Sequence, residues 1–180
     1  VKKVAFAQCA GSRDENNLNY CSAICCMASL KQATYVRDAY PDAEVTIFYI
    51  DLRAPGKYEA FLNRVQGDEG VTLTKGKVAK LEEDPATGDV IVTAEDVLGG
   101  GRIHEHFDLV VLAAGMESAA RGQKLPLELP MEENDFIEAG GLPAGVYACG
   151  VAKGPADVTT SVQEATGAAL GCFQSARGGN

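Results

Sequence analysis

Short apolar runs alternate with longer amphipathic segments over the first two thirds of the chain, and this alternation is the strongest constraint on the fold. The runs at 4–7 and 109–114 are continuously apolar, and the segment 44–50 is mostly apolar, as is typical of strands buried on both faces of a parallel sheet. Between them, residues 21–40 suit a long helix, and apolar residues recur at helical spacing from Tyr58 onward. This order predicts an α/β fold with a Rossmann-like, NAD-binding-like sheet.

The middle of the chain has a different character. Two alternating segments, 77–83 and 89–95, flank a loop at 84–89 that is rich in turn-forming residues. A third alternating segment, 102–107, follows three consecutive glycines. We expect a small antiparallel meander, inserted after a short parallel strand at 71–74.

The remainder of the chain forms a separate part in our interpretation. We assign residues 1–115 to the Rossmann-like domain and residues 116–180 to a linker and the tail of a second domain. This second part starts with an irregular, proline-containing stretch. It ends with a predicted strand at 146–149 and a predicted helix from about residue 159 to residue 176.

Composition limits the expected partners and location. The formal net charge of -9 argues against a nucleic-acid surface, which needs clustered Lys and Arg. No run approaches the roughly 18 apolar residues of a membrane span, and no signal peptide is visible, so we expect no direct membrane insertion. A chain with an ample core has little need of disulfides, which favours reduced thiols and a cytoplasmic location.

Four cysteines lie close to the first turn of the predicted sheet, at Cys9, Cys21, Cys25 and Cys26. Neighbouring thiolates are soft ligands, and four of them can hold a zinc ion or an iron–sulfur cluster. The spacing C-x11-C-x3-C-C lacks the two paired knuckles of common zinc sites. On a helix Cys21 and Cys25 share one face, whereas Cys26 points about 100° away, which suits a polynuclear cluster better than a single ion. We expect all four to be metal ligands, with an iron–sulfur cluster favoured over zinc and over simple core packing.

The same turn is where a Rossmann domain holds a dinucleotide. That role needs G-x-G-x-x-G, so that the backbone can approach a pyrophosphate. Residues 8–14 contain a single glycine, Gly11, and a cysteine instead. Asp51, at the end of the second predicted strand, can still contact a ribose hydroxyl, but it lies well beyond the usual offset of about 20 residues. The sequence therefore disfavours a dinucleotide here.

Several segments resemble one family of redox flavoproteins. They are similar to the flavoprotein A subunit of heterodisulfide reductase, and to the related A subunit of the quinone-interacting membrane-bound oxidoreductase complex. The resemblance covers most of the chain, and its most specific part is the cysteine block. The segments that carry it are Cys9–Asp14, Tyr20–Ser22, Cys25–Met27, Ala43–Tyr49, Phe107–Met116 and Gly145–Gly150. We expect the chain to be a C-terminal fragment of such a flavoprotein.

The resemblance implies an oxidoreductase subunit that relays electrons between FAD and a 4Fe–4S cluster held by the four cysteines. Its fold would be that of a two-domain, thioredoxin-reductase-like flavoprotein, with other redox subunits as partners and a homodimer left open. The N-terminal FAD fingerprint is missing, so FAD binding would need a further part of the protein and the isolated fragment would be inactive. Residues implied to contact FAD are Ala114, Gly115, Gly150, Val151, Asp157 and Val158.

Other functions stay open at this point. The vicinal pair Cys25–Cys26, together with Cys21, also suits a thiol–disulfide oxidoreductase without a cluster. A non-catalytic docking domain for electron-transfer partners is a further alternative. His104 and His106 share one side of a predicted strand, but we favour an exposed polar face there because no third ligand lies nearby in the sequence.

Overall fold

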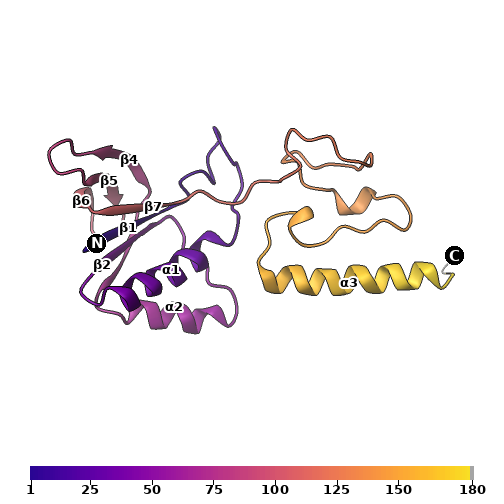
Figure 1. Cartoon of the computed structure of the whole chain (residues 1–180), viewed down its shortest axis with the longest axis horizontal. Coiled ribbons are helices and arrows are strands. Elements are labelled where there is room, and N and C mark those ends of the chain that lie inside the picture. The colour runs from indigo at the N-terminus through magenta and orange to yellow at the C-terminus, as the bar shows by residue number, and fades with distance from the viewer. Residues whose placement is uncertain (179–180) are drawn as a thin grey trace. The chain divides into compact units, whose positions relative to one another are not determined.

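The computed structural model describes residues 1–178, which divide into two compact units (Figure 1). The first unit holds residues 1–21 and 25–115. The second holds residues 22–24 and the described residues from Met116 onward.

A four-stranded parallel sheet forms the centre of the first unit. Its order is β3 (Val71–Lys75), β2 (Glu44–Tyr49), β1 (Lys3–Gln8) and β7 (Leu109–Ala113). All of its pairings are parallel, and β1 is buried from its second residue onward. The predicted α/β fold with a Rossmann-like sheet is confirmed.

Two helices cover one face of this sheet. They are α1 (Cys25–Ala39), which connects β1 to β2, and α2 (Tyr58–Gln66), which connects β2 to β3. Alternate residues of β1 face them, because side chains in a strand point to opposite faces in turn. The apolar core on this side contains Val4, Phe6, Leu30, Ala33, Val45, Ile47, Val65 and Val71.

The predicted antiparallel meander is also present. It consists of β4 (Val78–Glu83), β5 (Val90–Asp96) and β6 (Gly101–Phe107), in that spatial order. A second apolar core joins the meander to the parallel sheet. In this core Phe48 and Phe107 make an edge-to-face contact, with their ring centroids 6.1 Å apart.

Two expectations about the first unit are wrong. The first helix begins at Cys25 rather than Cys21, so Cys21 and Cys25 do not share a helix face. Ala23 has a φ of 58°, a left-handed conformation that a right-handed helix does not contain. In addition, β7 lies at the edge of the sheet and is not buried on both faces as expected, since its Leu112 is 57% exposed.

The second unit contains one long helix, α3 (Val158–Ala176), and two short 3-10 turns, η1 (Ala139–Gly141) and η2 (Gly150–Ala152). The predicted strand at 146–149 is wrong, because a strand needs a pairing partner and these residues have none within the described chain. The predicted helix is present and begins one residue earlier than expected.

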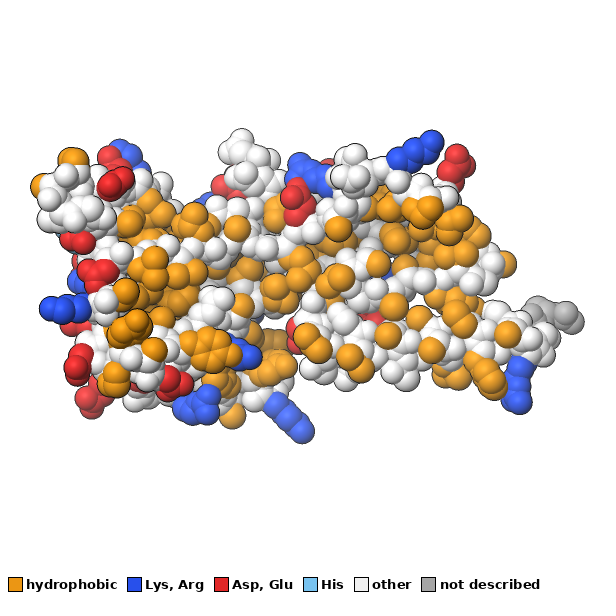
Figure 2. Space-filling model, viewed as in Figure 1, with side chains coloured by type: hydrophobic (Ala, Val, Ile, Leu, Met, Phe, Trp, Pro, Cys, Tyr) orange, Lys and Arg blue, Asp and Glu red, His pale blue; other side chains and the backbone are white. Residues whose placement is uncertain are grey.

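Helix α3 has an apolar surface that its own unit does not cover. None of its residues is buried, and hydrophobic side chains are visible along it in Figure 2. The most exposed large ones are Val158, Val162, Leu170 and Phe173. Within residues 1–178, no helix has both the length and the hydropathy needed to cross a bilayer.

Candidate metal centre

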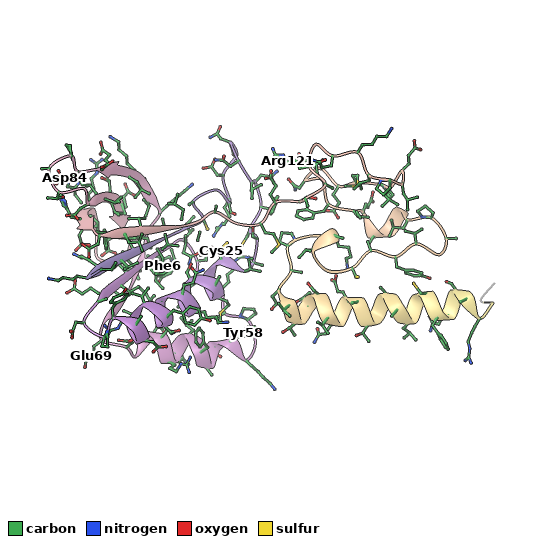
Figure 3. The ribbon with its side chains drawn as sticks, in the orientation of Figure 1. Phe6, Cys25, Tyr58, Glu69, Asp84 and Arg121 are labelled. Carbon is green, nitrogen blue, oxygen red and sulfur yellow. The ribbon has the colours of Figure 1, made fainter. Side chains whose placement is uncertain are left out.

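The connection between β1 and α1 carries the four cysteines predicted as metal ligands, all within the first unit. Cys9 directly follows β1, Cys21 lies in the loop, and Cys25 and Cys26 are the first residues of α1. Figure 3 shows Cys25 at this end of the helix. A strand end and a helix start therefore present three of the thiols, and the loop supplies the fourth.

The thiols of Cys9, Cys25 and Cys26 all have a pKa above the ordinary value for cysteine. Burial is the largest cause for each, because it disfavours the charged thiolate. The charges of Cys21 and Cys26 also raise the pKa of Cys9. All three other members of the group raise the pKa of Cys25. The four sulfur atoms therefore lie near enough to one another to interact electrostatically.

This environment determines what the thiols do without a metal. A thiol with a raised pKa stays protonated and is a poor nucleophile at neutral pH, whereas reactive cysteines have a lowered pKa. A metal ion or an iron–sulfur cluster supplies positive charge and displaces the thiol protons. The raised pKa of Cys9, Cys25 and Cys26 therefore disfavours thiol–disulfide exchange at these three residues. All six cysteines lie among the described residues, and none of them forms a disulfide there.

The cysteine loop has an unusual backbone. Cys9, Arg13 and Ala23 have φ values of 57°, 56° and 58°, in the left-handed region that residues other than glycine rarely adopt. The loop is held in this shape partly by its own backbone, where the N–H of Arg13 donates to the carbonyl of Tyr20 at 3.1 Å. Strained conformations of this kind persist where the surroundings hold them, and they concentrate at functional sites.

Polar contacts tie the cysteine loop to the end of β2. The Cys26 thiol donates to the backbone carbonyl of Asp51, with Sγ and O 3.4 Å apart. The carboxylate of the same Asp51 accepts from Arg13 Nη1 at 2.7 Å. The sequence analysis did not identify Arg13, because its partner is 38 positions away along the chain and no local pattern connects the two.

Gln8 places a buried amide next to the cysteines. It is the last residue of β1 and 3% exposed, and its Nε2 donates to the carbonyl of Cys25 at 3.4 Å. Among the described residues, its Oε1 is the one buried side-chain N or O atom without a hydrogen-bond partner. Native proteins rarely leave such an atom unpaired. The sequence did contain a signal for Gln8, because it is the polar residue that ends the apolar run 4–7.

The donor set fits a metal group by its chemistry, because four soft thiols are available in one place. Within residues 1–178, however, no three His, Cys, Asp or Glu side chains converge closely enough to hold a metal ion. A single tetrahedral zinc with Zn–S bonds of about 2.3 Å brings its thiolates to within roughly 3.8 Å of one another. A 4Fe–4S cluster is bound through separate irons, so its four thiolates stay farther apart. The assignment of the four cysteines as ligands remains a prediction.

The two histidines considered above are engaged elsewhere in the meander. His104 Nδ1 is 3.3 Å from Thr93 Oγ1. His106 Nδ1 is 3.6 Å from the carboxylate of Asp84 at the hairpin loop. Both contacts are with residues of the meander itself.

The turn after β1 is not built to hold a pyrophosphate. The backbone N–H groups of Ala10, Arg13 and Asp14 all donate to carbonyl groups of the first unit. They are therefore not directed at a ligand, as they are in a glycine-rich nucleotide turn. The Asp51 carboxylate, which the sequence left available for a ribose hydroxyl, is paired with Arg13.

A cavity of about 1100 Å³ nevertheless lies beside Cys9, at the carboxyl ends of β1, β2 and β3. Ligands of open α/β sheets bind at this edge. Its lining carries charges of both signs, from Arg13, Asp14, Asp51, Lys75, Lys77, Lys80 and Glu95.

The residues implied to contact FAD fall in both units. Ala114 and Gly115 follow β7 in the first unit, and Ser12 Oγ donates to the carbonyl of Ala114 at 2.9 Å. Gly115 has a φ of 112°, which favours glycine. These two residues therefore continue the chain directly from the carboxyl end of β7.

The other implied FAD residues surround the start of α3 in the second unit. Gly150 has a φ of 59°, and its N–H donates to Glu164 Oε2 at 2.7 Å. The Asp157 carboxylate caps the helix by accepting from the N–H of Thr160 at 2.7 Å. Val158 is 81% exposed, and Val151 is exposed as well. The structure thus gives Asp157 a folding role, while its contact with FAD remains a prediction.

Known proteins similar to this chain agree on one protein family. No family model matches the chain. An iron-sulfur A subunit of the CoB–CoM heterodisulfide reductase of Methanopyrus kandleri is 38% identical over 180 residues. The corresponding iron-sulfur A subunit of Methanocaldococcus jannaschii is 40% identical over 179 residues. This chain is a relative of the heterodisulfide reductase A subunit. Both matches cover 93% of the chain but only 27% of the relative, so the chain spans about a quarter of the length of these subunits.

Solved structures establish the fold of this relative of the heterodisulfide reductase A subunit. Thioredoxin reductase from T. acidophilum superposes with a TM-score of 0.61 at 17% identity, over 98% of this chain and 53% of that enzyme. The thioredoxin reductase of Lactococcus lactis superposes with a TM-score of 0.64 at 16% identity, over 97% of this chain and 52% of that enzyme. The thioredoxin-reductase-like fold expected from the sequence is therefore confirmed. The resemblance to the heterodisulfide reductase family is confirmed as well, and the resemblance to the quinone-linked A subunit remains an expectation.

Proposed function

We propose that this chain is the cluster-bearing part of an electron-transfer subunit, and that Cys9, Cys21, Cys25 and Cys26 hold a 4Fe–4S cluster. The observation that carries the proposal is the placement of four cysteines in one unit, from the end of β1 to the first two residues of α1. The names of the relatives support it, since they describe reductase subunits and, in the two cases above, iron-sulfur subunits.

When bound, such a cluster supplies a centre that accepts and releases one electron at a time. The chain's own residues prepare the site for it. Burial raises the pKa of Cys9, Cys25 and Cys26 and so favours their protonated form until a metal binds, while Arg13 and Lys77 lower the pKa of Cys9 by their positive charge. The loop ties Cys26 to Asp51, which fixes its position relative to the end of β2.

We propose that FAD is the electron partner of this centre and that residues 116–180 are the tail of the FAD domain. In the first unit Ala114 and Gly115, and in the second unit the 3-10 turn that begins at Gly150 and the start of α3, would contact the cofactor. The exposed apolar side chains of α3 are expected for a helix whose packing partner belongs to a longer protein. Stable FAD binding would then need sequence beyond the region matched here, which is 27% of the relatives.

The partners would be other redox subunits of a heterodisulfide-reductase-like complex in the cytoplasm. A relative from Methanothermobacter marburgensis is named as the A subunit of an H(2):CoB–CoM heterodisulfide,ferredoxin reductase. The name describes a multi-subunit enzyme, and we extend that organisation to this chain. A homodimer remains an expectation that no contact in the structure addresses.

The test is iron and acid-labile sulfide analysis after anaerobic reconstitution. We expect about four irons and four sulfides per chain, as a single 4Fe–4S cluster requires. Cys9→Ser and Cys26→Ser variants should lose most of this iron. Cys149→Ser and Cys172→Ser are matched controls in the second unit and should retain it. One zinc per chain, or equal losses in all four variants, would contradict the proposal.

A further inference from the structure

Arg13 contacts two segments that flank the cysteine site, one through its backbone and one through its side chain. Its backbone N–H donates to the carbonyl of Tyr20, the residue before Cys21. Its side chain reaches across to the end of β2, where Nη1 lies 2.7 Å from Asp51 Oδ2. The backbone carbonyl of this Asp51 in turn accepts from the Cys26 thiol.

The backbone of Arg13 indicates that its position is specifically held. Its φ of 56° lies in the left-handed region, where an arginine has no intrinsic advantage. Tertiary contacts must maintain such a conformation, and here the contacts are the backbone bond to Tyr20 and the ion pair with Asp51. The result is a guanidinium held against the Asp51 carboxylate, just beyond the end of β2.

Charge provides the second line of argument. Arg13 and Cys9 both line the cavity at the carboxyl edge of the sheet. The side chain of Arg13 is 29% exposed, so water screens its charge only in part. Cys9 and Cys21 both raise the pKa of Arg13, after the larger effect of its hydrogen bond to Asp51, which places the cation within electrostatic reach of two of the four sulfurs.

We infer that the Arg13–Asp51 ion pair is a positioning device for the four-cysteine site that also sets its reduction potential, an inference that rests on the proposed cluster. Reduction adds one electron to the site, and no bond forms or breaks. The positive charge of Arg13 favours the reduced, more negative form, and the negative charge of Asp51 opposes it. The ion pair also holds the loop that contains Cys21 against the residue that contacts Cys26.

The two roles make distinguishable predictions. As charges, Arg13 and Asp51 act in opposite directions, so Arg13→Gln should lower the midpoint potential of the cluster and Asp51→Asn should raise it. As a mechanical tie, either substitution breaks the same ion pair. Both variants should therefore release iron to a chelator faster, by roughly ten-fold for loss of an outer-shell partner.

The experiment is a redox titration of the reconstituted 180-residue chain with dithionite. Electron paramagnetic resonance monitors the reduced cluster during the titration and gives its midpoint potential. Arg13→Lys keeps the positive charge, so the midpoint potential of the cluster should stay close to the wild-type value. This variant should still release iron faster than the wild type. Arg64→Gln, on α2, is the matched control and should change neither quantity. The double variant R13Q/D51N should return toward the wild-type potential.

The outcomes separate this inference from the proposed function. If the wild-type chain assembles no 4Fe–4S cluster, the proposed function fails and this inference fails with it. If the cluster assembles but Arg13→Gln and Asp51→Asn shift the potential in the same direction, or not at all, only the inference is overturned. Should Arg13→Gln fail to assemble a cluster, Asp51→Asn and Arg13→Lys still decide the question.

Discussion

At the scale of single residues, the protonation of buried thiols links metal binding to stability. Cys9, Cys25 and Cys26 have a raised pKa in the folded chain, chiefly because of burial, whereas an unfolded cysteine titrates near 8.5. Below that value both states carry the protons, and the folded state has its full stability. As the pH rises further, the thiols of the unfolded state lose their protons before those of the folded state, so the free energy of unfolding falls.

We therefore expect the metal-free chain to lose stability between about pH 8 and pH 10. Urea unfolding at pH 7.0 and pH 9.5, under reducing conditions, measures this as a fall in the free energy of unfolding. A variant with all four cysteines replaced by Ser is the control, because serine does not titrate in this range. An equal fall in the control would show that other groups are responsible.

At the scale of elements, one glycine allows the meander to pack against the end of β3. Gly76 lies between β3 and β4, and a Cβ at this position would collide with the backbone carbonyl of Glu95 in β5. The backbone cannot easily yield there, since the N–H of Gly76 donates to the carbonyl of Tyr49 at 2.8 Å.

Gly76→Ala should therefore lower the free energy of unfolding of the first unit by about 1–3 kcal/mol, as is usual for overpacking. Gly154→Ala is the matched control, because nothing lies within 4 Å of its Cβ position. Urea titration followed by circular dichroism compares the two. Equal stability of the two variants would mean that the contact between β3 and β5 relaxes without cost.

The elements that the sequence predicts well are those with a local signature. Strand β1 is an apolar run because both of its faces are covered, and the meander alternates because one of its faces is exposed. The failures depend on distant contacts. Residues 146–149 have the composition of a strand but no partner, and the start of α1 depends on a loop that closes on itself.

The candidate site follows the same division. Residue type and spacing identify the four cysteines, because clustered thiols have few other uses. The role of Arg13 is evident only in three dimensions, since it pairs with the distant Asp51. Gln8 left a weak signal, as the polar residue that ends an apolar run, but its contact with the carbonyl of Cys25 appears only in the structure. Sequence-based interpretation thus proposed the ligands, which remain a prediction, and missed the groups around them.

At the scale of the whole molecule, the chain is a relative of one segment of a longer protein, and this bears on flavin binding. The residues implied to contact FAD belong to two units, and the matched region is 27% of the relatives. We expect the isolated chain to carry no stoichiometric flavin. Absorbance near 450 nm after purification, compared before and after incubation with FAD, measures it. A yellow chain with about one flavin per molecule would contradict the expectation.

The central claim is that the four cysteines of the first unit hold a single 4Fe–4S cluster. Mössbauer spectroscopy of the chain reconstituted anaerobically with ⁵⁷Fe tests it most directly, because the spectrum distinguishes the nuclearity of iron sites and accounts for all the iron present. We expect nearly all the iron in the doublet of a 4Fe–4S cluster, and its loss when the four cysteines are replaced by Ser. A spectrum of mononuclear or two-iron sites, or an unchanged spectrum in the Ser variant, would contradict the account.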